Sequence, residues 1–393
     1  MPLRIGHGRG PDPSSTRAGS IQDRQHGRRD RTAPLRRSGT DRRAATSGLQ
    51  PYGACHDRRA ASQRQSGPAS RLRAGGIPLR PEDHGAAVRD VFVGVDLGGT
   101  GSRFVARGPQ GVIRTSVLKT AELGAGSRET RLERLVGTIH RLVPLGDTLA
   151  GIGIGATGPV DRGAGVIHNF DTLPKFSEIR LVAEVETRLK VPVIIENDAV
   201  VAAIGEHRLG AGEGASRMLM VTLGTGIGAA FLVNGEPFRG PNGMHPETGH
   251  IPIVSGIGRC YCGAEGCWEQ VASRSALQAM LRQHLPSDVP AKEVIPLAAA
   301  SVGRNPFIRE AFDTYGSLVG RGLSILHTHY LPSVTVLGGS AAAYLHLFEE
   351  KLHRAIERTP AFAVASAIHV ARLGDEAGAI GAALVAQDQF AKR

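Results

Sequence analysis

One histidine and three cysteines stand close together in the chain and form a complete ligand set for a tetrahedral zinc ion. They are His250, Cys260, Cys262 and Cys267. Four glycines between residues 256 and 266 allow the backbone to turn tightly enough for the ligands to converge. A disulfide is the alternative, but Cys260 and Cys262 are too close to pair readily and three thiols are an odd number. Because four protein ligands leave no position for a catalytic water, we expect the metal to shape a loop.

Two glycine-rich turns, each at the end of a predicted buried strand, have the composition of phosphate-binding loops. Asp96-Leu97-Gly98-Gly99-Thr100 follows a strand predicted over 91–96, and Leu223-Gly224-Thr225-Gly226-Ile227-Gly228 follows one predicted over 218–223. Main-chain N–H groups can approach an anion at such glycines. Neither turn continues into Gly-Lys-Ser/Thr, which excludes the Walker pattern. A single glycine turn is also an ordinary connection, but the pair predicts a duplicated domain that holds a polyphosphate from both sides of a cleft.

Three carboxylates stand where they could serve a substrate. Asp198 follows the strand predicted over 191–195, at the start of a helix, where it could accept a proton from a hydroxyl or merely cap the helix. Glu247 and Glu269 flank the predicted metal loop, so they could hold sugar hydroxyls, or be ordinary solvated surface groups. The residues alone leave both pairs of alternatives open.

The composition is that of a globular α/β protein with a basic front segment. Residues 1–90 hold 18 arginines, no lysine and 8 acidic residues, which accounts for +10 of the net charge of +11. We expect this segment to be disordered, with a nucleic-acid-binding tail as the alternative. Aromatic residues are only 4% of the chain, which disfavours base-stacking surfaces. No membrane span and no secretory signal is visible, so we expect a cytoplasmic protein.

Strands and helices alternate along the rest of the chain, which indicates the α/β class. The pattern predicts helices over 128–142, 176–189, 198–208 and 377–390, and a mostly helical stretch over 275–329. Further strands are predicted over 102–106, 111–118, 150–154, 229–233, 333–337 and 368–372.

Taken in order, these motifs make the chain from residue 91 to about residue 390 resemble the ROK family of sugar kinases and repressors. The motifs that carry the resemblance are 95–100, 153–161 (Gly-Ile-Gly-Ala-Thr-Gly-Pro-Val-Asp), 196–199 (Glu-Asn-Asp-Ala), 222–228, Glu247-Thr248-Gly249-His250 with the three cysteines, Gly338-Gly339 and 374–383. The resemblance implies the actin-like ATPase (ribonuclease H-like) fold, with two α/β domains and an interdomain cleft. The expected small domain covers 91–208 with the last helix, about 378–393. The expected large domain covers 209–377, with the zinc loop and a dimer surface.

The resemblance also implies a role for each matching residue. Asp198 corresponds to the general base of the family. The expected sugar ligands are Gly158, Asn197, Glu247, His250 and Glu269, with His250 also on zinc through its other ring nitrogen. The expected phosphate, magnesium and nucleotide positions are Asp96, Gly98, Gly99, Thr100, Gly224, Thr225, Gly226, Gly338 and Gly339.

Three positions depart from the pattern of the family. Gly101 stands where many family kinases have a lysine, which removes a positive charge near the phosphates. Ser273-Arg274 replaces the frequent Ser-Gly pair, and Val200-Val201 replaces a usual polar residue.

The function implied is ATP-dependent phosphorylation of a hexose, with Mg²⁺ and a structural Zn²⁺. Gly266-Cys267-Trp268-Glu269-Gln270 resembles the bacterial ROK glucokinases, so glucose is the first expectation. N-acetylmannosamine, N-acetylglucosamine and fructose remain alternatives, as does polyphosphate as the donor. A sugar-responsive repressor is the rival from another class, although residues 1–90 lack the two amphipathic helices of a helix-turn-helix. A sugar-sensing pseudokinase is a third reading. The resemblance further suggests a homodimer or homotetramer, with nucleic acid as a partner only if the front segment reads DNA.

Overall fold

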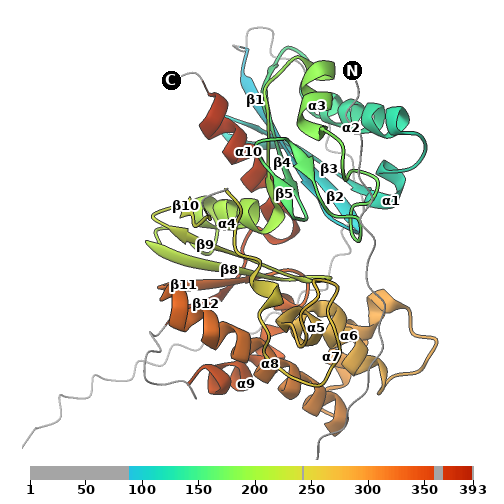
Figure 1. The fold of residues 1–393 in the computed structure, drawn as a ribbon, viewed down its shortest axis with the longest axis vertical. Helices are drawn as coiled ribbons and strands as arrows, with labels where there is room; N and C mark the ends of the chain where they lie inside the picture. Colours follow the sequence, from blue (N-terminus) through green and yellow to red (C-terminus); the bar gives the residue numbers. More distant parts are fainter. Residues whose placement is uncertain (1–87, 241–242, 358–365, 392–393) are drawn as a thin grey trace, which may run out of the picture. The chain divides into compact units, whose positions relative to one another are not determined.

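Two five-stranded sheets with the same topology form the framework of the protein (Figure 1). The structure, a computed structural model, describes residues 88–240, 243–357 and 366–391. The strand order is β3-β2-β1-β4-β7 in the first sheet and β10-β9-β8-β11-β12 in the second. In each sheet an antiparallel meander of three strands is followed by two strands that run parallel to the first. The duplication predicted from the two glycine turns is therefore confirmed at the level of topology.

The strands are short and mostly buried, as expected for sheets covered on both faces. The first sheet consists of β1 (Asp90–Leu97), β2 (Gly101–Gly108), β3 (Gly111–Lys119), β4 (Thr148–Ala156) and β7 (Val193–Asn197). The second consists of β8 (Arg217–Leu223), β9 (Ile227–Val233), β10 (Glu236–Pro237), β11 (Val334–Gly338) and β12 (Ala367–Val370). A small hairpin pairs β5 (Val160–Asp161) with β6 (Val166–Ile167).

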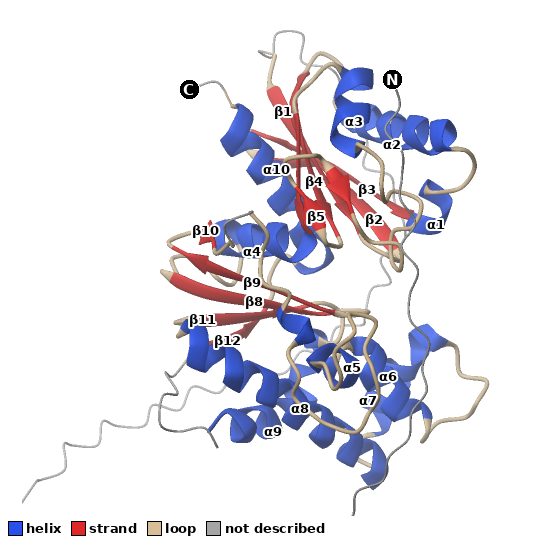
Figure 2. Cartoon of the chain, in the orientation of Figure 1, coloured by secondary structure: helices blue, strands red, loops and turns tan. Residues whose placement is uncertain are grey.

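Helices cover the sheets and also join them. α10 (Ala377–Phe390) packs on β1 and β4, α4 (Asp198–Leu209) packs on β8 and β9, and the two helices pack on each other between the sheets (Figure 2). The remaining helices cover the outer faces. They are α1 (Thr120–Leu123), α2 (Arg128–Leu142), α3 (Leu181–Leu189), α5 (Trp268–Ala272), α6 (Arg274–Arg282), α7 (Val294–Ser301), α8 (Pro306–Tyr330) and α9 (Leu345–Glu357).

Glycines allow α4 and α10 to approach at backbone distance. A Cβ added to Gly381 would lie 1.7 Å from the carbonyl oxygen of Val201, and one added to Gly205 would lie 2.7 Å from that of Ala377. A larger residue at either position would push the helices apart, because real Cβ atoms do not come that close to backbone atoms. The separation of the two sheets is thus set by main-chain contact.

Each sheet has its own hydrophobic core on its outer side. Leu132, Leu135 and Ile139 recur at helical spacing on α2 and are fully buried against the first sheet. Beneath the second sheet, the Trp268 ring is completely buried, and its Nε1 donates a hydrogen bond to the carbonyl oxygen of Leu318 at 3.1 Å. Full burial of such large side chains makes the outer helices parts of the core rather than attachments.

The structure confirms most predicted elements and corrects two. The helices predicted over 128–142 and 377–390 are present with those bounds. The helix predicted over 176–189 is shorter, because residues 176–180 form turns in which the Glu178 N–H donates to Ile167 O at 2.9 Å. The helix α9 was not predicted, and the predicted stretch 275–329 is divided into α6, α7 and α8. The expected disorder of residues 1–90 falls, except for its last three positions, outside the described residues and stays a prediction. Within the described part of the chain, no helix is both long and apolar enough to cross a membrane.

We expect acid to destabilise the protein through His327 on α8. This side chain is 2% exposed, its Nε2 lies 2.8 Å from Thr335 Oγ1, and burial lowers its pKa to about 4. The pKa in the folded state is below that of an unfolded histidine, so this contribution is intact above about pH 6.5 and is lost as the pH falls towards 4. The expected loss is on the order of 2–4 kcal/mol.

Urea unfolding of the wild type and His327→Gln at pH 7, 6, 5 and 4.5 measures this effect. Glutamine retains a partner for Thr335 but does not titrate, so the variant should lose stability less steeply on acidification. His346→Gln, at an exposed position, is the control and should follow the wild type. Identical pH slopes for the wild type and His327→Gln would contradict the prediction.

Candidate active site

The four predicted zinc ligands come together in one cluster. One potential ligand atom from each of His250, Cys260, Cys262 and Cys267 lies within 4.8 Å of the others. His250 Nδ1 is 3.6 Å from Cys260 Sγ, and Cys262 Sγ is 3.5 Å from Cys267 Sγ. Tetrahedral ligands on zinc, at bond lengths of about 2.0–2.3 Å, lie roughly 3.5–3.8 Å apart. The side chains therefore fit a closed, four-ligand zinc site, and all three cysteines are free.

A tight loop positions these ligands. The Cys260 N–H donates to Ala264 O at 2.7 Å, and short bridges pair Arg259 with Glu265 and Pro252 with Cys267. At Gly266 φ is +75°, and an added Cβ would lie 1.8 Å from Val254 O, so only glycine fits. The loop thus places the last cysteine at the start of α5.

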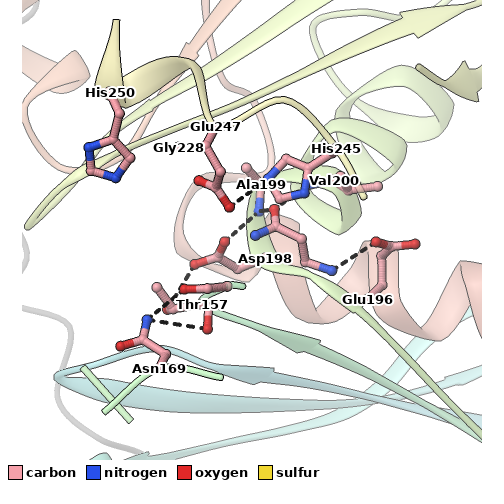
Figure 3. Close-up of polar contacts among 12 residues, drawn as sticks. Thr157, Asn169, Glu196, Asp198, Ala199, Val200, Gly228, His245, Glu247 and His250 are labelled. Carbon is pink, nitrogen blue, oxygen red and sulfur yellow. Dashed lines mark hydrogen bonds and ion pairs between the residues drawn. The ribbon is translucent and has the colours of Figure 1, made fainter. Parts of the chain in front are cut away.

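Asp198 is the first residue of α4 and lies at the end of the parallel strand β7. The helix is capped by its neighbour: Asn197 Oδ1 accepts hydrogen bonds from the N–H groups of Ala199 at 2.8 Å and Val200 at 3.2 Å. Asn197 therefore caps the helix, and Asp198 Oδ1 also accepts the N–H of Ala199 at 2.8 Å. The other oxygen of the half-buried Asp198 carboxylate, Oδ2, faces Thr157 (Figure 3).

Two residues that the sequence did not single out support this carboxylate. Thr157 Oγ1 donates a hydrogen bond to Asp198 Oδ2 at 2.9 Å, and Asn169 Nδ2 donates one to Gly158 O at 2.7 Å (Figure 3). Asn169 Oδ1 in turn accepts from the N–H of Thr172 at 2.8 Å. The loop from β4 is therefore held from below by one asparagine and directed at Asp198 by one hydroxyl.

Gly158, Asn197 and Glu247 come close together at one place beside Asp198. A Cβ added to Gly158 would lie 3.0 Å from Asn197 Nδ2 and 3.4 Å from Glu247 Oε1. The Glu247 side chain is 42% exposed, so a ligand can reach it. Amide, carboxylate and main-chain groups that converge on one space next to Asp198 are the groups that bind hydroxyls.

The electrostatics of this space are dominated by carboxylates. Desolvation, followed by the charges of Asp198 and Glu269, raises the pKa of Glu247 to about 7. His245, another residue that the sequence did not indicate, lies 3.7 Å from Glu247 through Nε2 (Figure 3). Burial lowers the pKa of His245, so the imidazole is neutral at physiological pH. At neutral pH Glu247 can therefore accept or donate a hydrogen bond.

An ion-pair network lies behind the space. Glu196, buried at the end of β7, accepts from Arg162 Nε at 2.9 Å and from Arg239 Nη2 at 2.5 Å. Arg162 follows β5 and Arg239 follows β10, so one carboxylate connects loops of the first and second sheets immediately before Asn197.

On the other side of Asp198 lies a second concentration of negative charge. Burial, with the charges of Asp198 and Asp375 adding to it, raises the pKa of Asp96 to about 7, and Arg103 partly opposes this shift. Arg103 Nη2 is itself 2.9 Å from Asp375 Oδ2. The turn at Gly98, Gly99 and Thr100 follows Asp96 and is open to solvent at its tip. The predicted phosphate and magnesium positions are thus adjacent to the predicted base.

The second glycine turn joins β8 to β9 and is connected to the metal loop. The Gly224 N–H donates to Gly226 O at 3.0 Å, which closes the turn around Thr225. Glu269 Oε2 accepts the N–H of Ile227 at 2.8 Å. One oxygen of the predicted sugar ligand Glu269 is therefore committed to the turn, a link that sequence spacing did not reveal.

Gly338 and Gly339 lie at the end of β11, beside the second turn. At Gly339 φ is +78°, and an added Cβ would lie 2.6 Å from the backbone of Leu223. They line a pocket of about 390 Å³ with Arg274, Lys292 and Tyr344, among others. The predicted adenosine position therefore borders a real pocket.

These features define a class of protein. Two α/β domains of repeated topology, each with a glycine turn after its first strand, form the actin-like ATPase (ribonuclease H-like) fold. The sequence profile of the ROK family matches residues 92–389. The chain belongs to the ROK family.

Known proteins similar to this chain include enzymes and a repressor. A glucokinase of Halalkalibacterium halodurans is 31% identical over 321 residues, which is 76% of this chain and 95% of that protein. A xylose repressor of Bacillus subtilis is 29% identical over 63% of this chain and 64% of its own length. Among solved structures, a ROK family glucokinase from Streptomyces griseus, in complex with glucose and AMPPNP, is 28% identical, with a TM-score of 0.65 over 76% of this chain and 99% of that one.

We expect the purified protein to hold one zinc ion per chain and Cys262→Ser to lose it. The remaining three ligands cannot close the tetrahedron, so the loop between His250 and Cys267 should loosen and the melting temperature should fall by several degrees. Elemental analysis and thermal denaturation measure both effects. Cys55→Ser, at the remaining cysteine, is the control. A Cys262→Ser protein without metal and with wild-type stability would show that the loop does not need zinc.

Proposed function

We propose that this protein transfers the γ-phosphoryl group of ATP to a hexose hydroxyl, with glucose as the first substrate. The observation that carries the proposal is the place of Asp198. Its carboxylate lies between the polar groups of Gly158, Asn197 and Glu247 on one side and the Asp96 carboxylate at the first glycine turn on the other. A base that faces a hydroxyl-binding space on one side and phosphate loops on the other is what phosphoryl transfer to an alcohol requires.

In the proposed reaction Asp198 accepts the proton of the attacking hydroxyl. The sugar oxygen forms a bond to the γ-phosphorus while the bond from that phosphorus to the β,γ-bridging oxygen breaks, and ADP carries away the electron pair. Main-chain N–H groups of the turns at Gly98–Gly99 and Gly224–Gly226 spread the developing charge.

The negative charge around Asp96 is of the kind that a divalent cation would neutralise. Within the described residues, the charges that act on Asp96 include two further carboxylates, Asp198 and Asp375, against one arginine, Arg103. This excess of negative charge is what hard cations with oxygen ligands neutralise. Mg²⁺ held at Asp96 would screen the charge of the nucleotide phosphates.

The sugar would be held by Gly158, Asn197, Glu247, His250 and Glu269. His250 would present Nε2 to it, since Nδ1 faces Cys260 and Nε2 lies 3.0 Å from the Tyr261 hydroxyl, a bond that a sugar could replace. Glucose takes first place because named relatives are glucokinases and one was solved with glucose. N-acetylmannosamine, N-acetylglucosamine and fructose are the alternatives for this site, and polyphosphate is the alternative donor.

The proposal includes the arrangement of the whole protein. We expect a small domain over 91–208 with the last helix, a large domain over 209–377, structural zinc, a homodimer or homotetramer, and a cytoplasmic location. A sugar-responsive repressor is the second candidate, because the xylose repressor of Bacillus subtilis is 29% identical to this chain over 63% of its length, against 31% over 76% for the glucokinase of Halalkalibacterium halodurans. A repressor has no need of Asp198 as a base, so turnover separates the two.

Asp198→Asn should reduce kcat by roughly 10²–10⁴-fold or more while the KM for the sugar changes little, because the amide cannot accept the proton. Direct measurement of the sugar phosphate by mass spectrometry, over a panel of hexoses with ATP and with polyphosphate, gives both constants. Asp288→Asn, at an exposed loop position, is the control. Near-full turnover by Asp198→Asn would refute the mechanism, and a wild type inactive on every sugar would favour the repressor.

Thr157→Val should lower kcat by roughly 10-fold with the sugar KM within about twofold, because valine keeps the shape but cannot orient Asp198 Oδ2. Thr157→Ser restores the hydroxyl and should recover most of the rate. A purely structural role would instead lower the stability of both variants, and it would raise the sugar KM as well as lower kcat. Steady-state kinetics with matched unfolding curves decide between these outcomes.

A further inference from the structure

Arg274 stands at the junction of the second glycine turn and the pocket beside Gly338. It is the first residue of α6, and its main-chain N–H donates to Gly224 O at 2.8 Å. Its Nη2 is 3.4 Å from Thr225 Oγ1, and its side chain lines the pocket at the end of β11. In Figure 1, α6 lies beside α5 and α7, beneath the sheet that carries the turn. One side chain therefore reaches from the pocket to the turn.

The Arg274 guanidinium has hydrogen-bond donors that the rest of the protein does not fully use. Its two side-chain contacts, to Thr225 Oγ1 and Gln278 Oε1, are both 3.4 Å long, at the weak end for hydrogen bonds. Within residues 88–240, 243–357 and 366–391, no carboxylate forms an ion pair with Arg274. An arginine fork with several unused donors at the mouth of a pocket is suited to phosphoryl oxygens, which it can hold in pairs.

The cations nearest the first turn in the sheet are already paired, as Lys119, opposite Gly101 in the strand register, is with Glu122. The first turn ends in Gly101, which carries no cation. Arg103, the next cation on β2, is already paired with Asp375. The other cation lining the pocket is Lys292, which has no hydrogen bond or ion pair to either glycine turn among the described contacts. A nucleoside triphosphate brings about four negative charges, so an unpaired cation beside its phosphates would stabilise it in addition to a bound metal ion.

We propose that Arg274 binds the phosphate chain of the donor nucleotide and supplies the positive charge that the first turn lacks. The inference rests on the proposed function and deepens it, because it assigns to this chain a donor-binding residue outside the glycine turns. It also favours a nucleoside di- or triphosphate over free polyphosphate. The pocket at Gly338–Gly339 would hold the base and ribose, and Arg274 would meet the phosphates where they leave the pocket.

Nucleotide binding tests the proposal without relying on turnover. Arg274→Gln should weaken ADP binding by roughly 10-fold to 100-fold, the effect of a lost charged hydrogen bond, and leave adenosine binding within about twofold. Titration calorimetry of the wild type and the variant with ADP and with adenosine gives both constants. Arg304→Gln is the control and should bind both ligands as the wild type does, because Arg304 is exposed and its side chain forms no hydrogen bond or ion pair within the described part of the chain.

A second, independent test places a positive charge at position 101 in the variant that lacks Arg274. In Gly101→Lys/Arg274→Gln the lysine should recover at least part of the lost ADP affinity. Position 101 has room for a side chain, since an added Cβ would lie 3.8 Å from Arg103 Nη1 and 4.0 Å from Leu118 O, and φ is not in the left-handed region. In steady-state assays, Arg274→Gln should raise the KM for ATP by a similar factor while the KM for glucose stays within twofold.

The outcomes separate this proposal from the one on which it rests. Unchanged ADP binding in Arg274→Gln, or an equal loss for ADP and adenosine, would overturn the role of Arg274, the latter by indicating a purely structural role. A larger loss of ADP affinity in Lys292→Gln than in Arg274→Gln would move the role to the other cation. If ADP binding depends on Arg274 but no hexose is phosphorylated, the proposed function fails and the phosphate-binding role stands.

Discussion

Main-chain contact between α4 and α10 fixes the geometry on which the site depends. Each of these helices follows the last strand of its own sheet, so the contact joins equivalent parts of the two domains. Gly205 and Gly381 make the contact close, and an added side chain at either would force the helices apart. Because Asp198 begins α4 and the start of α10 packs on Asp96, whose carboxylate would lie 2.9 Å from a Cβ at Gly378, the two carboxylates are held together by the same contact. The proposed base and the proposed cation site are thus consequences of how the sheets are joined.

This arrangement concentrates negative charge that the protein alone does not neutralise. The pKa values of Asp96 and Glu247 are both raised to about 7, first by burial and then by neighbouring carboxylates, with Asp198 common to both. Such crowding of carboxylates lowers the stability of the folded state at neutral pH, so a role in folding alone does not explain it. A cation at one end and sugar hydroxyls at the other would supply the missing partners. The strain is therefore what a site that waits for two ligands should show.

The sequence was informative where a function depends on residues close together in the chain, and silent where it depends on the fold. The predicted zinc ligands lie within 18 positions and were predicted together, and the helix 377–390 begins with the apolar run 377–386. Thr157 lies 41 residues from Asp198, and only the parallel pairing of β4 with β7 brings them within hydrogen-bonding distance. His245 is a lone histidine beside no recognised pattern, and its role becomes visible only next to Glu247. The bond from Glu269 to Ile227 likewise spans 42 residues, so no spacing rule could find it.

The bond from Ile227 to Glu269 also connects the predicted zinc loop to the second glycine turn. Glu269 follows Cys267 by two residues and receives the N–H at the end of the second glycine turn, while His250 at the other end of the loop follows Glu247 by three. A metal bound by the two ends of this loop would therefore orient both the proposed hydroxyl-binding carboxylate and the proposed phosphate turn. Groups that hold a ligand gain precision when their supports are rigid and shared, because a shift in one partner then moves the other with it. In this protein the proposed structural metal would set the distance between the two substrates, although it touches neither reacting atom.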